Sequence, residues 1–383
     1  GSGIGLIDKA IIIDGFQRAY KVGMRNRFVS TPRDTGLESM LHWDGSTRIS
    51  VPMPDGTWLA MTMAEPEAAT SPRDAAWLSE TQESKLASLD LTVAFNEDSA
   101  MHVGLEQSPA AQLADDPQMI DALGLFAGAA DMVAPQYTLL GQGAGMRFSQ
   151  ALDGDTSLSV GWMYSDGDEP DIHDNYDGGA GNAFQLALAR RLPGGVRLGL
   201  SAAVVQESGS FLGSENDGAF DSGNGATSQF YSLSASWPVA ENFELFGSYT
   251  MAMTELDGTP NGMLSDWSHV SSDAFGMGFI ARELMTEGDR FGFIAGQPLR
   301  VNSANATLTV PVGVSASGAV AYQSDRVDVT PSGREFDLQL AYARPLWEGA
   351  DIGAWTLLQL NPGQDAEAGP GYGGGLRFHL ELN

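Results

Sequence analysis

The sequence predicts an all-β protein, a transmembrane antiparallel β-barrel of about twelve strands, and three observations lead to this fold. From residue 143 to residue 383 the chain alternates apolar and polar residues in one strand-length segment after another. Short turns and long polar loops alternate between these segments. The composition, with 43% hydrophobic residues but only 18% charged residues, fits neither a disordered chain nor an ordinary soluble enzyme.

The chain divides near Gly141. We expect residues 1–108 to be a linker and small β region that follows a passenger domain, residues 109–142 to be a helical or plug segment, and residues 143–383 to be the barrel. The sequence leaves open whether residues 1–140 belong to the wall, to a plug or to the periplasm.

Before the barrel, residues 46–53 and 57–63 are typical of a hairpin whose turn is Pro54-Asp55-Gly56. Residues 86–96 alternate well and are expected to pair with residues 99–107. From about residue 107 to residue 130 the apolar spacing becomes helical. A helix directly before a barrel often lies in its lumen, and we expect this one there.

The barrel segments carry large apolar residues on one face and small or polar residues on the other. The apolar rows include Leu158, Val160, Trp162 and Tyr164, then Leu198, Leu200 and Val204, then Tyr231, Leu233 and Trp237, and finally Leu376 and Phe378. Turns at 153–154, 193–195 and 238–242 are short, whereas loops at 166–180, 208–225 and 254–270 are long. Short periplasmic turns and long external loops are typical of the bacterial outer membrane, and a soluble β-sandwich is the competing fold.

The charge balance excludes one class of partner. The formal net charge is −29, so binding to nucleic acid through a basic surface is not expected. The chain has no cysteine, which excludes disulfides and thiolate metal sites. It also has no run of 18 or more apolar residues that would predict a transmembrane helix.

No catalytic, cofactor-binding or metal-binding residue is predicted. The five histidines lie outside any catalytic motif, and no Gly-x-Ser-x-Gly is present. His173 lies in the acidic loop 166–177, where carboxylates could hold calcium or serve an enzyme at the barrel rim. Simple solvation of the loop is the favoured interpretation.

Charged residues that alternate with the apolar rows are expected to line the lumen, since they face away from lipid. These lumen candidates are Arg147, Arg197, Arg377, His379 and Glu381.

Two stretches resemble a known family. The segment Pro331-Ser332-Gly333-Arg334-Glu335, with the strand after it and Arg344-Pro345-Leu346, resembles the C-terminal autotransporter-like barrels of subtilisin-like serine proteases. The N-terminal residues 3–10 resemble the glycine-rich segment and helix that follow the catalytic serine in such enzymes.

The resemblance implies an outer-membrane barrel of a Gram-negative bacterium that anchors or secretes an N-terminal subtilisin-like passenger. The implied partners are the lipid bilayer with lipopolysaccharide, the barrel assembly machinery, and the chain's own passenger domain, attached or cleaved. The catalytic motif Gly-Thr-Ser-Met-Ala is absent. The chain itself is therefore expected to be no enzyme, but the C-terminal part of a serine endopeptidase precursor.

Two questions stay open at this point. Arg334 and Glu335 are either a buried ion pair that fixes strand register or part of a plain turn. The alternative function is a stand-alone porin or channel, whose constriction would place Arg147, Arg197 and Arg377 against the acidic loops.

Overall fold

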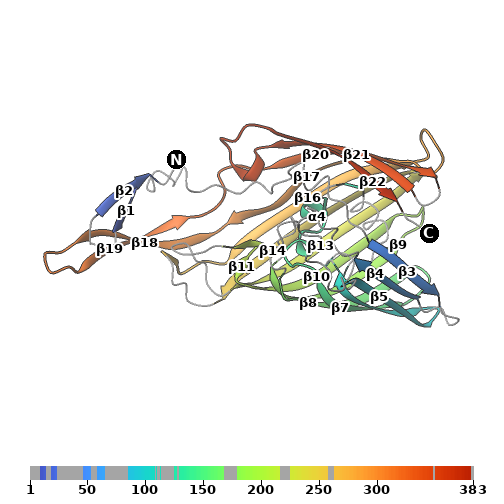
Figure 1. Ribbon diagram of the computed structural model, residues 1–383, viewed down its shortest axis with the longest axis horizontal. Helices are drawn as coiled ribbons and strands as arrows, with labels where there is room; N and C mark the ends of the chain where they lie inside the picture. The colour runs from blue at the N-terminus through green and yellow to red at the C-terminus, as the bar shows by residue number, and fades with distance from the viewer. Residues whose placement is uncertain are drawn as a thin grey trace, which may run out of the picture.

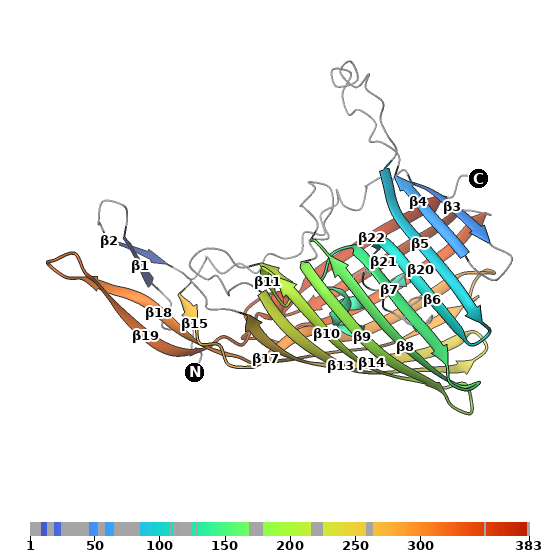
Figure 2. The ribbon, with the colours of Figure 1, turned by 90° about the horizontal axis from the view of Figure 1, so that it is seen from below.

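The large feature of the molecule is one antiparallel sheet of fifteen strands, which curls around an inner segment (Figures 1 and 2). This computed structural model describes residues 9–13, 19–23, 46–52, 58–64, 85–107, 109, 113, 125–126, 129–167, 179–215, 225–257, 263–347 and 350–380. The strands of the sheet, in chain order, are β3 (Ser46–Pro52), β4 (Trp58–Ala64), β5 (Lys85–Asn96), β6 (Ser99–Gln107), β7 (Gly143–Ala151), β8 (Thr156–Ser165), β9 (Ala180–Arg191), β10 (Arg197–Ser208), β13 (Gly225–Ala240), β14 (Phe243–Asp257), β16 (Val270–Arg282), β17 (Arg290–Ser303), β20 (Phe336–Trp347), β21 (Ala350–Leu360) and β22 (Gly371–Leu380).

The antiparallel all-β architecture is confirmed, but the expected strand count of about twelve is wrong. Strands β7 to β22 contribute eleven strands to the sheet, and β3 to β6 contribute four more. The expected hairpins at 46–63 and 86–107 exist as β3–β4 and β5–β6. They pair onward with β7, so the first part of the chain holds strands of the same sheet rather than a separate small β region.

The remaining strands form small sheets outside the large one. They are β1 (Lys9–Ile13) with β2 (Ala19–Gly23), β11 (Ser210–Phe211) with β12 (Ser214–Glu215), and β15 (Leu264–Ser265) with β18 (Asn305–Val314) and β19 (Val320–Asp328). Although β18 and β19 lie within the part of the chain expected to form the barrel, they are not strands of the large sheet. They form a hairpin that extends beyond the end of the large sheet (Figures 1 and 2).

The two ends of the sheet differ in their connections. At one end, which we call the turn end, neighbouring strands are joined by two to seven residues; at the other, the loop end, they are joined by ten to thirty-five. Both outermost strands, β3 and β22, run from the loop end to the turn end. No pairing between them occurs among the described residues. A closure that is antiparallel throughout needs an even number of strands.

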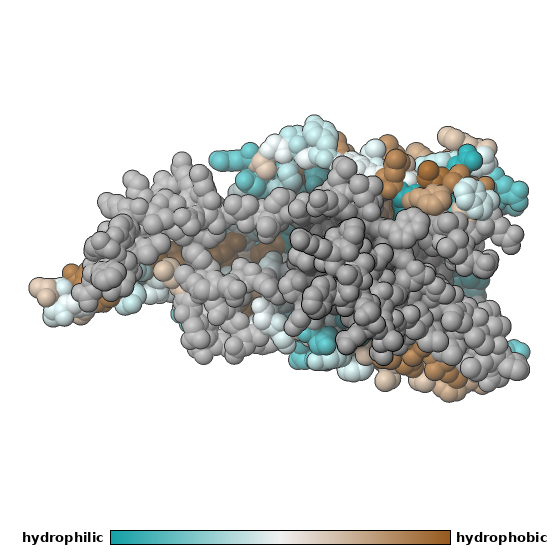
Figure 3. Space-filling model, in the orientation of Figure 1, coloured by the Kyte–Doolittle hydropathy of each residue, from teal (hydrophilic) through white to brown (hydrophobic). Residues whose placement is uncertain are grey.

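The burial pattern is inverted relative to a soluble protein. On β9 the side chains of Phe184, Leu186 and Leu188 are exposed, while Ala183 and Gln185 between them are buried. On β13, Tyr231, Leu233 and Trp237 are exposed in the same way. The apolar rows therefore do not pack against a second sheet. In Figure 3 apolar side chains of this kind gather over the strands β20, β21 and β22.

The turn between β16 and β17 shows how the turn end is held together. The carboxylate of Asp289 accepts hydrogen bonds from the backbone N–H groups of Leu284, Met285 and Thr286 at 2.8–2.9 Å. The hydroxyl of Tyr342 on β20 also donates to it at 3.2 Å. Desolvation raises the pKa of Asp289, but these hydrogen bonds outweigh it, and the pKa lies below its usual value.

Asp289→Asn should therefore destabilise the folded protein in a pH-dependent manner. Because the native pKa is depressed, the ionised carboxylate contributes stability that is fully present above the unfolded pKa near 3.9. This contribution is lost as the pH falls through the native pKa. Urea unfolding in detergent between neutral and acid pH should show a wild-type advantage that shrinks on acidification. Glu287→Gln, an exposed change in the same turn, is the control and should show no such advantage.

Candidate functional site

The interior of the curled sheet is filled by a segment of the chain that lies between β6 and β7. This inner segment is described at residues 113, 125–126 and 129–140, which include the helix α4 (Ala129–Val133) and the 3-10 turn η2 (Pro135–Tyr137). Most of its described side chains are buried: Leu113, Leu125, Phe126, Ala129, Met132, Val133, Ala134, Tyr137, Leu139 and Leu140. The described residues of the inner segment, which fall within the expected plug segment 109–142, lie in the interior. The segment is an insertion between two wall strands and does not precede the sheet, because β3 to β6 come before it.

The wall makes room for this inner segment with small residues. A Cβ atom added to Gly276 on β16 would lie 2.6 Å from a methyl group of Val133. One added to Gly292 on β17 would lie 2.5 Å from the ring of Phe126. On the opposite side, a Cβ on Gly161 of β8 would lie 2.6 Å from Leu113. The glycines therefore permit a close approach that any larger residue would block.

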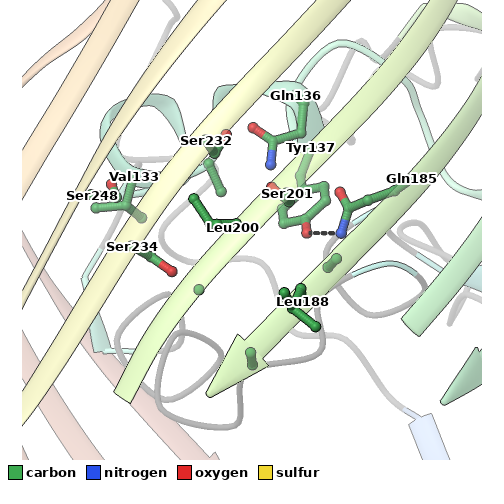
Figure 4. Close-up of a pocket in the computed structure, with 14 residues that line it drawn as sticks. Val133, Gln136, Tyr137, Gln185, Leu188, Leu200, Ser201, Ser232, Ser234 and Ser248 are labelled. Carbon is green, nitrogen blue, oxygen red and sulfur yellow. Dashed lines mark hydrogen bonds between the residues drawn. The ribbon is translucent and has the colours of Figure 1, made fainter. Parts of the chain in front are cut away.

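One hydrogen-bonded side chain fastens the inner segment to β9. The amide nitrogen of Gln185 donates to the backbone oxygen of Leu113 at 3.0 Å and to the hydroxyl of Tyr137 at 2.9 Å (Figure 4). Gln185 is 3% exposed, so water cannot readily replace either hydrogen bond, and the loss of one would destabilise the fold. The two bonds hold the beginning and the end of the segment at the same wall strand.

A cavity lies between the inner segment and the turn end, and apolar residues such as Val133 and Ala134 line it together with polar ones. Its lining combines Gln136 and Tyr137 of the segment with the serines Ser201, Ser232, Ser234 and Ser248 of the wall, as Figure 4 shows. These serines alternate with the exposed apolar rows of β10, β13 and β14. On these strands, serine hydroxyl groups therefore lie on the inner face, and leucine and tyrosine side chains lie on the outer face.

Below this cavity, inward-facing arginines gather at the turn end. Arg191 and Arg197 pair across β9 and β10, and Arg197 is also opposite the buried Ser236. Arg282 and Arg290 pair in the same way across β16 and β17. Carboxylates accompany them: Arg282 lies 3.2 Å from Glu244, and Arg377 lies 4.0 Å from Asp351.

The inner face is acidic at the loop end. Glu207, near the end of β10, is 3% exposed and accepts hydrogen bonds from Ser210 and from the N–H groups of Leu212 and Gly213. Glu335 and Asp337, at the start of β20, share the amide nitrogen of Gln359, at 2.8 Å and 3.4 Å.

Between the two ends, a smaller polar group lies on the inner face of β5, β6 and β7. The ring nitrogen Nδ1 of His102 lies 3.4 Å from a carboxylate oxygen of Asp90 and 3.4 Å from the hydroxyl of Thr92. Arg147 is the next residue across, in register with His102.

The structure shows the positions of three of the predicted lumen residues. Arg147, Arg197 and Arg377 occupy inward positions, at mid-wall in the first case and toward the turn end in the others. The backbone of His379 is in register with Asp351, and Glu381 lies outside the described residues, as do residues 168–178 of the acidic loop. Sequence reasoning did not single out Arg191, Arg282, Arg290, Glu207 or Glu244. In the sequence, each of them is a charged residue close to a turn or loop, and it occupies the same alternating positions as the small residues of its strand.

The motif Pro331 to Glu335 acts as a clamp at the loop end. Arg334 donates to the side-chain oxygen of Gln297 on β17, whereas Glu335 accepts from Gln359 on β21 and from the N–H of Gly363. Arg334 and Glu335 thus hold two different neighbours rather than each other. Arg300 of β17 donates to the backbone oxygens of Pro331 and Gly333.

Among the described residues, no group of three or more histidine, aspartate or glutamate side chains is arranged to hold a metal ion. No described helix is long and apolar enough to cross a bilayer.

Comparisons with known proteins find distant structural neighbours only. No protein-family model matches the chain, and no curated protein is similar to it in sequence. The in-vitro folded outer membrane protein OmpT of Vibrio cholerae is 11% identical, with a TM-score of 0.46 and coverage of 87% of this chain and 88% of that one. An anion-selective porin from Comamonas acidovorans is 10% identical, with a TM-score of 0.45 and coverage of 85% and 83%. OmpF of Salmonella typhi, in complex with daunomycin, is 12% identical, with a TM-score of 0.42 and coverage of 88% of each chain. With similarity this distant, the function has to be argued from the chain's own residues.

The close contact at Gly276 should make this position intolerant of a side chain. Gly276→Ala places a methyl group against Val133 and Met132, and overpacking of this kind costs about 1–3 kcal/mol. Urea unfolding in detergent and limited proteolysis within residues 113–140 should both report the change. Gly247→Ala on the outer face of β14 is the matched control, because its nearest neighbour would be 3.4 Å away.

The double variant Gly276→Ala/Val133→Ala should regain part of the loss, since the clashing methyl group of Val133 is gone. Equal stability of Gly276→Ala and Gly247→Ala would contradict the close packing of segment and wall.

Proposed function

We propose that this chain is a bacterial outer-membrane β-barrel that works as a narrow diffusion channel. The observation that carries the proposal is the opposite character of the two wall faces. The outer face is apolar and exposed, whereas the inner face carries many small and polar residues beside buried apolar ones such as Phe230 and Ile280, and it surrounds the inner segment. Such a wall matches a surrounding of hydrocarbon and an interior that contains water.

The membrane assignment rests on the outer rows. Exposed apolar patches on soluble monomers rarely exceed a few hundred Å². Here exposed leucines, methionines and aromatic residues follow one another on the strands β7 to β16 and again on β20 to β22. Aromatic residues stand near both ends: Trp237 and Trp347 at the turn end, Tyr164 and Tyr372 at the loop end. Tryptophan and tyrosine favour the two interfaces of a bilayer in this manner.

The channel function rests on how the interior is occupied. The inner segment is joined at one end to β6 and at the other to β7, both at the loop end of the sheet. Because both ends of the segment are joined to wall strands at the same end of the sheet, the segment can narrow the passage while it stays inside the sheet. The serine-lined cavity and the inward arginines continue a polar route from the segment to the turn end.

Anchoring or secretion of a subtilisin-like passenger stays a prediction from the resemblance alone. The comparisons with known structures do not support it. The N-terminal residues 1–8 that carry part of the resemblance lie outside the described residues.

Two neighbouring residues on β13 test the membrane assignment. Leu233 faces outward and is 51% exposed, whereas Ser234 faces the inner cavity. Leu233→Arg should impair insertion and cost about 2–4 kcal/mol if the site lies near the bilayer centre. Ser234→Arg should be tolerated much better. Refolding into phospholipid vesicles, followed by the gel shift of folded against boiled protein, measures both. Equal effects of the two variants would exclude a lipid-facing outer row.

Single-channel recordings in planar bilayers test the channel itself. The wild-type chain should show small, defined conductance steps, because the inner segment fills much of the cross-section. Replacement of residues 113–140 by a short linker should raise the conductance several-fold. Removal of residues 311–322, the tip of the external hairpin, is the control and should leave the conductance unchanged. A folded, inserted protein that shows no steps in either form would favour an anchor over a channel.

A further inference from the structure

The charged groups on the inner face are sorted by sign along the barrel axis. Glu207, Glu335 and Asp337 lie at the loop end, and Asp131 on α4 is close enough to the last two to interact with them electrostatically. On the inner face of the strands at the turn end, arginines outnumber acids, while the turn residues Asp153 and Asp155 line the same surface hollow as Arg191 and Arg197. Those arginines are Arg191, Arg197, Arg282, Arg290 and Arg377, accompanied by Glu244 and Asp351. We call the first set the acidic zone and the second the arginine zone.

The two zones are far enough apart to act separately. The strand β10 carries Arg197 at its first residue and Glu207 one residue before its end. Ten residues of strand at about 3.3 Å each separate them by roughly 33 Å along the chain. The Debye length in about 0.1 M salt is only about 10 Å. Each zone therefore attracts its own counterions, cations at the loop end and anions at the turn end.

We propose that the channel rectifies ionic current, passing more when the loop end is positive than when it is negative; this inference rests on the proposed channel function. With the loop end positive, cations enter through the acidic zone and anions enter through the arginine zone. Both kinds of ion are drawn into the mouths that concentrate them, so the lumen fills with carriers. With the voltage reversed, each ion must enter through the zone that repels it, and the lumen is depleted.

Two zones of opposite charge lead to a different expectation for the ionic current than the net charge of the chain does. A chain with a formal net charge of −29 and acid spread evenly through its lumen would select cations and conduct equally in both directions. Two zones of opposite sign in series instead give weak selectivity between small cations and anions, together with a strong dependence on the sign of the voltage.

Single-channel current–voltage curves of the full-length protein in potassium chloride at pH 8 test the inference. In about 0.1 M salt the current should differ by about twofold or more between equal voltages of opposite sign. In about 1 M salt, where the Debye length is about 3 Å, the ratio should fall toward one.

The direction requires a marker for the turn end, which Gly154→Cys supplies. The chain has no other cysteine, and a Cβ at Gly154 meets nothing within 4 Å. Gly154 lines the same surface hollow as Arg191 and Arg197, so a charged thiol reagent should change the current when added on that side only. The larger current must then flow when the unlabelled side, the loop end, is positive.

A matched set of variants locates the cause. Arg191→Gln with Arg197→Gln should lower the rectification ratio, because the arginine zone loses two charges. Arg344→Gln removes a charge from the outer row of β20 near the turn end and should keep the wild-type ratio. Glu335→Gln with Asp337→Asn weakens the acidic zone and should lower the ratio from the other end, even if the arginine double variant fails to fold.

The possible outcomes distinguish a failure of the rectification proposal from a failure of the channel proposal. Absence of any conductance steps in folded, inserted protein would overturn the channel. Steps with a symmetric current–voltage curve at low salt would leave the channel in place and overturn rectification. An Arg344→Gln effect as large as that of the inward pair, or a larger current with the turn end positive, would also overturn it.

Discussion

The structure depends on one constraint, the alternation of side chains across a continuous hydrogen-bonded sheet. Each strand sends every second residue outward, and a slip of one residue in register would exchange the two faces of that strand. On β13 such a slip would turn Ser232, Ser234 and Ser236 outward and Leu233 and Trp237 inward. The pairing of β13 with β10 and β14 runs without interruption until Pro238, where the register shifts. Everything proposed for the interior follows from this register, because it determines which charges face inward.

The inner segment exploits the same constraint from the opposite side. A lumen lined by leucine throughout would leave no space for a folded loop, so the wall has glycine where the inner segment comes closest, beside larger residues such as Phe230 and Ile294 that pack against it. The segment supplies the bulk that the wall lacks, with Phe126 against Gly292 and Val133 against Gly276. Apolar side chains therefore occur on both sides of the wall, but for different reasons. Outside they face the surroundings, and inside they hold a loop in place with Gln185 as its polar fastening.

Local pattern was enough to predict the strands and their faces, but not their partners. The hairpin at Pro54-Asp55-Gly56, the rows on β9, β10 and β13, and the inward positions of Arg147, Arg197 and Arg377 all follow from alternation and turn residues. Membership of a sheet depends on distant pairing, which alternation does not encode. For this reason the sequence left open whether β5 and β6 belong to the wall, and it did not show that β18 and β19 form an external hairpin. The helical spacing near Leu113 and Phe126 indicated an interior segment but not that it links two wall strands.

The choice of arginine at the turn end has a physical reason. Lysine ends at Lys85 in the sequence, and beyond it the strong cations are all arginines. A lysine that is partly removed from water can lose its proton, whereas arginine keeps its charge and binds carboxylates through a planar fork. Arg282 beside the buried Glu244 can therefore remain charged in a narrow lumen at any pH the protein meets. With permanent positive charge at one end and carboxylates at the other, the electric asymmetry of the interior is set by residue type and register.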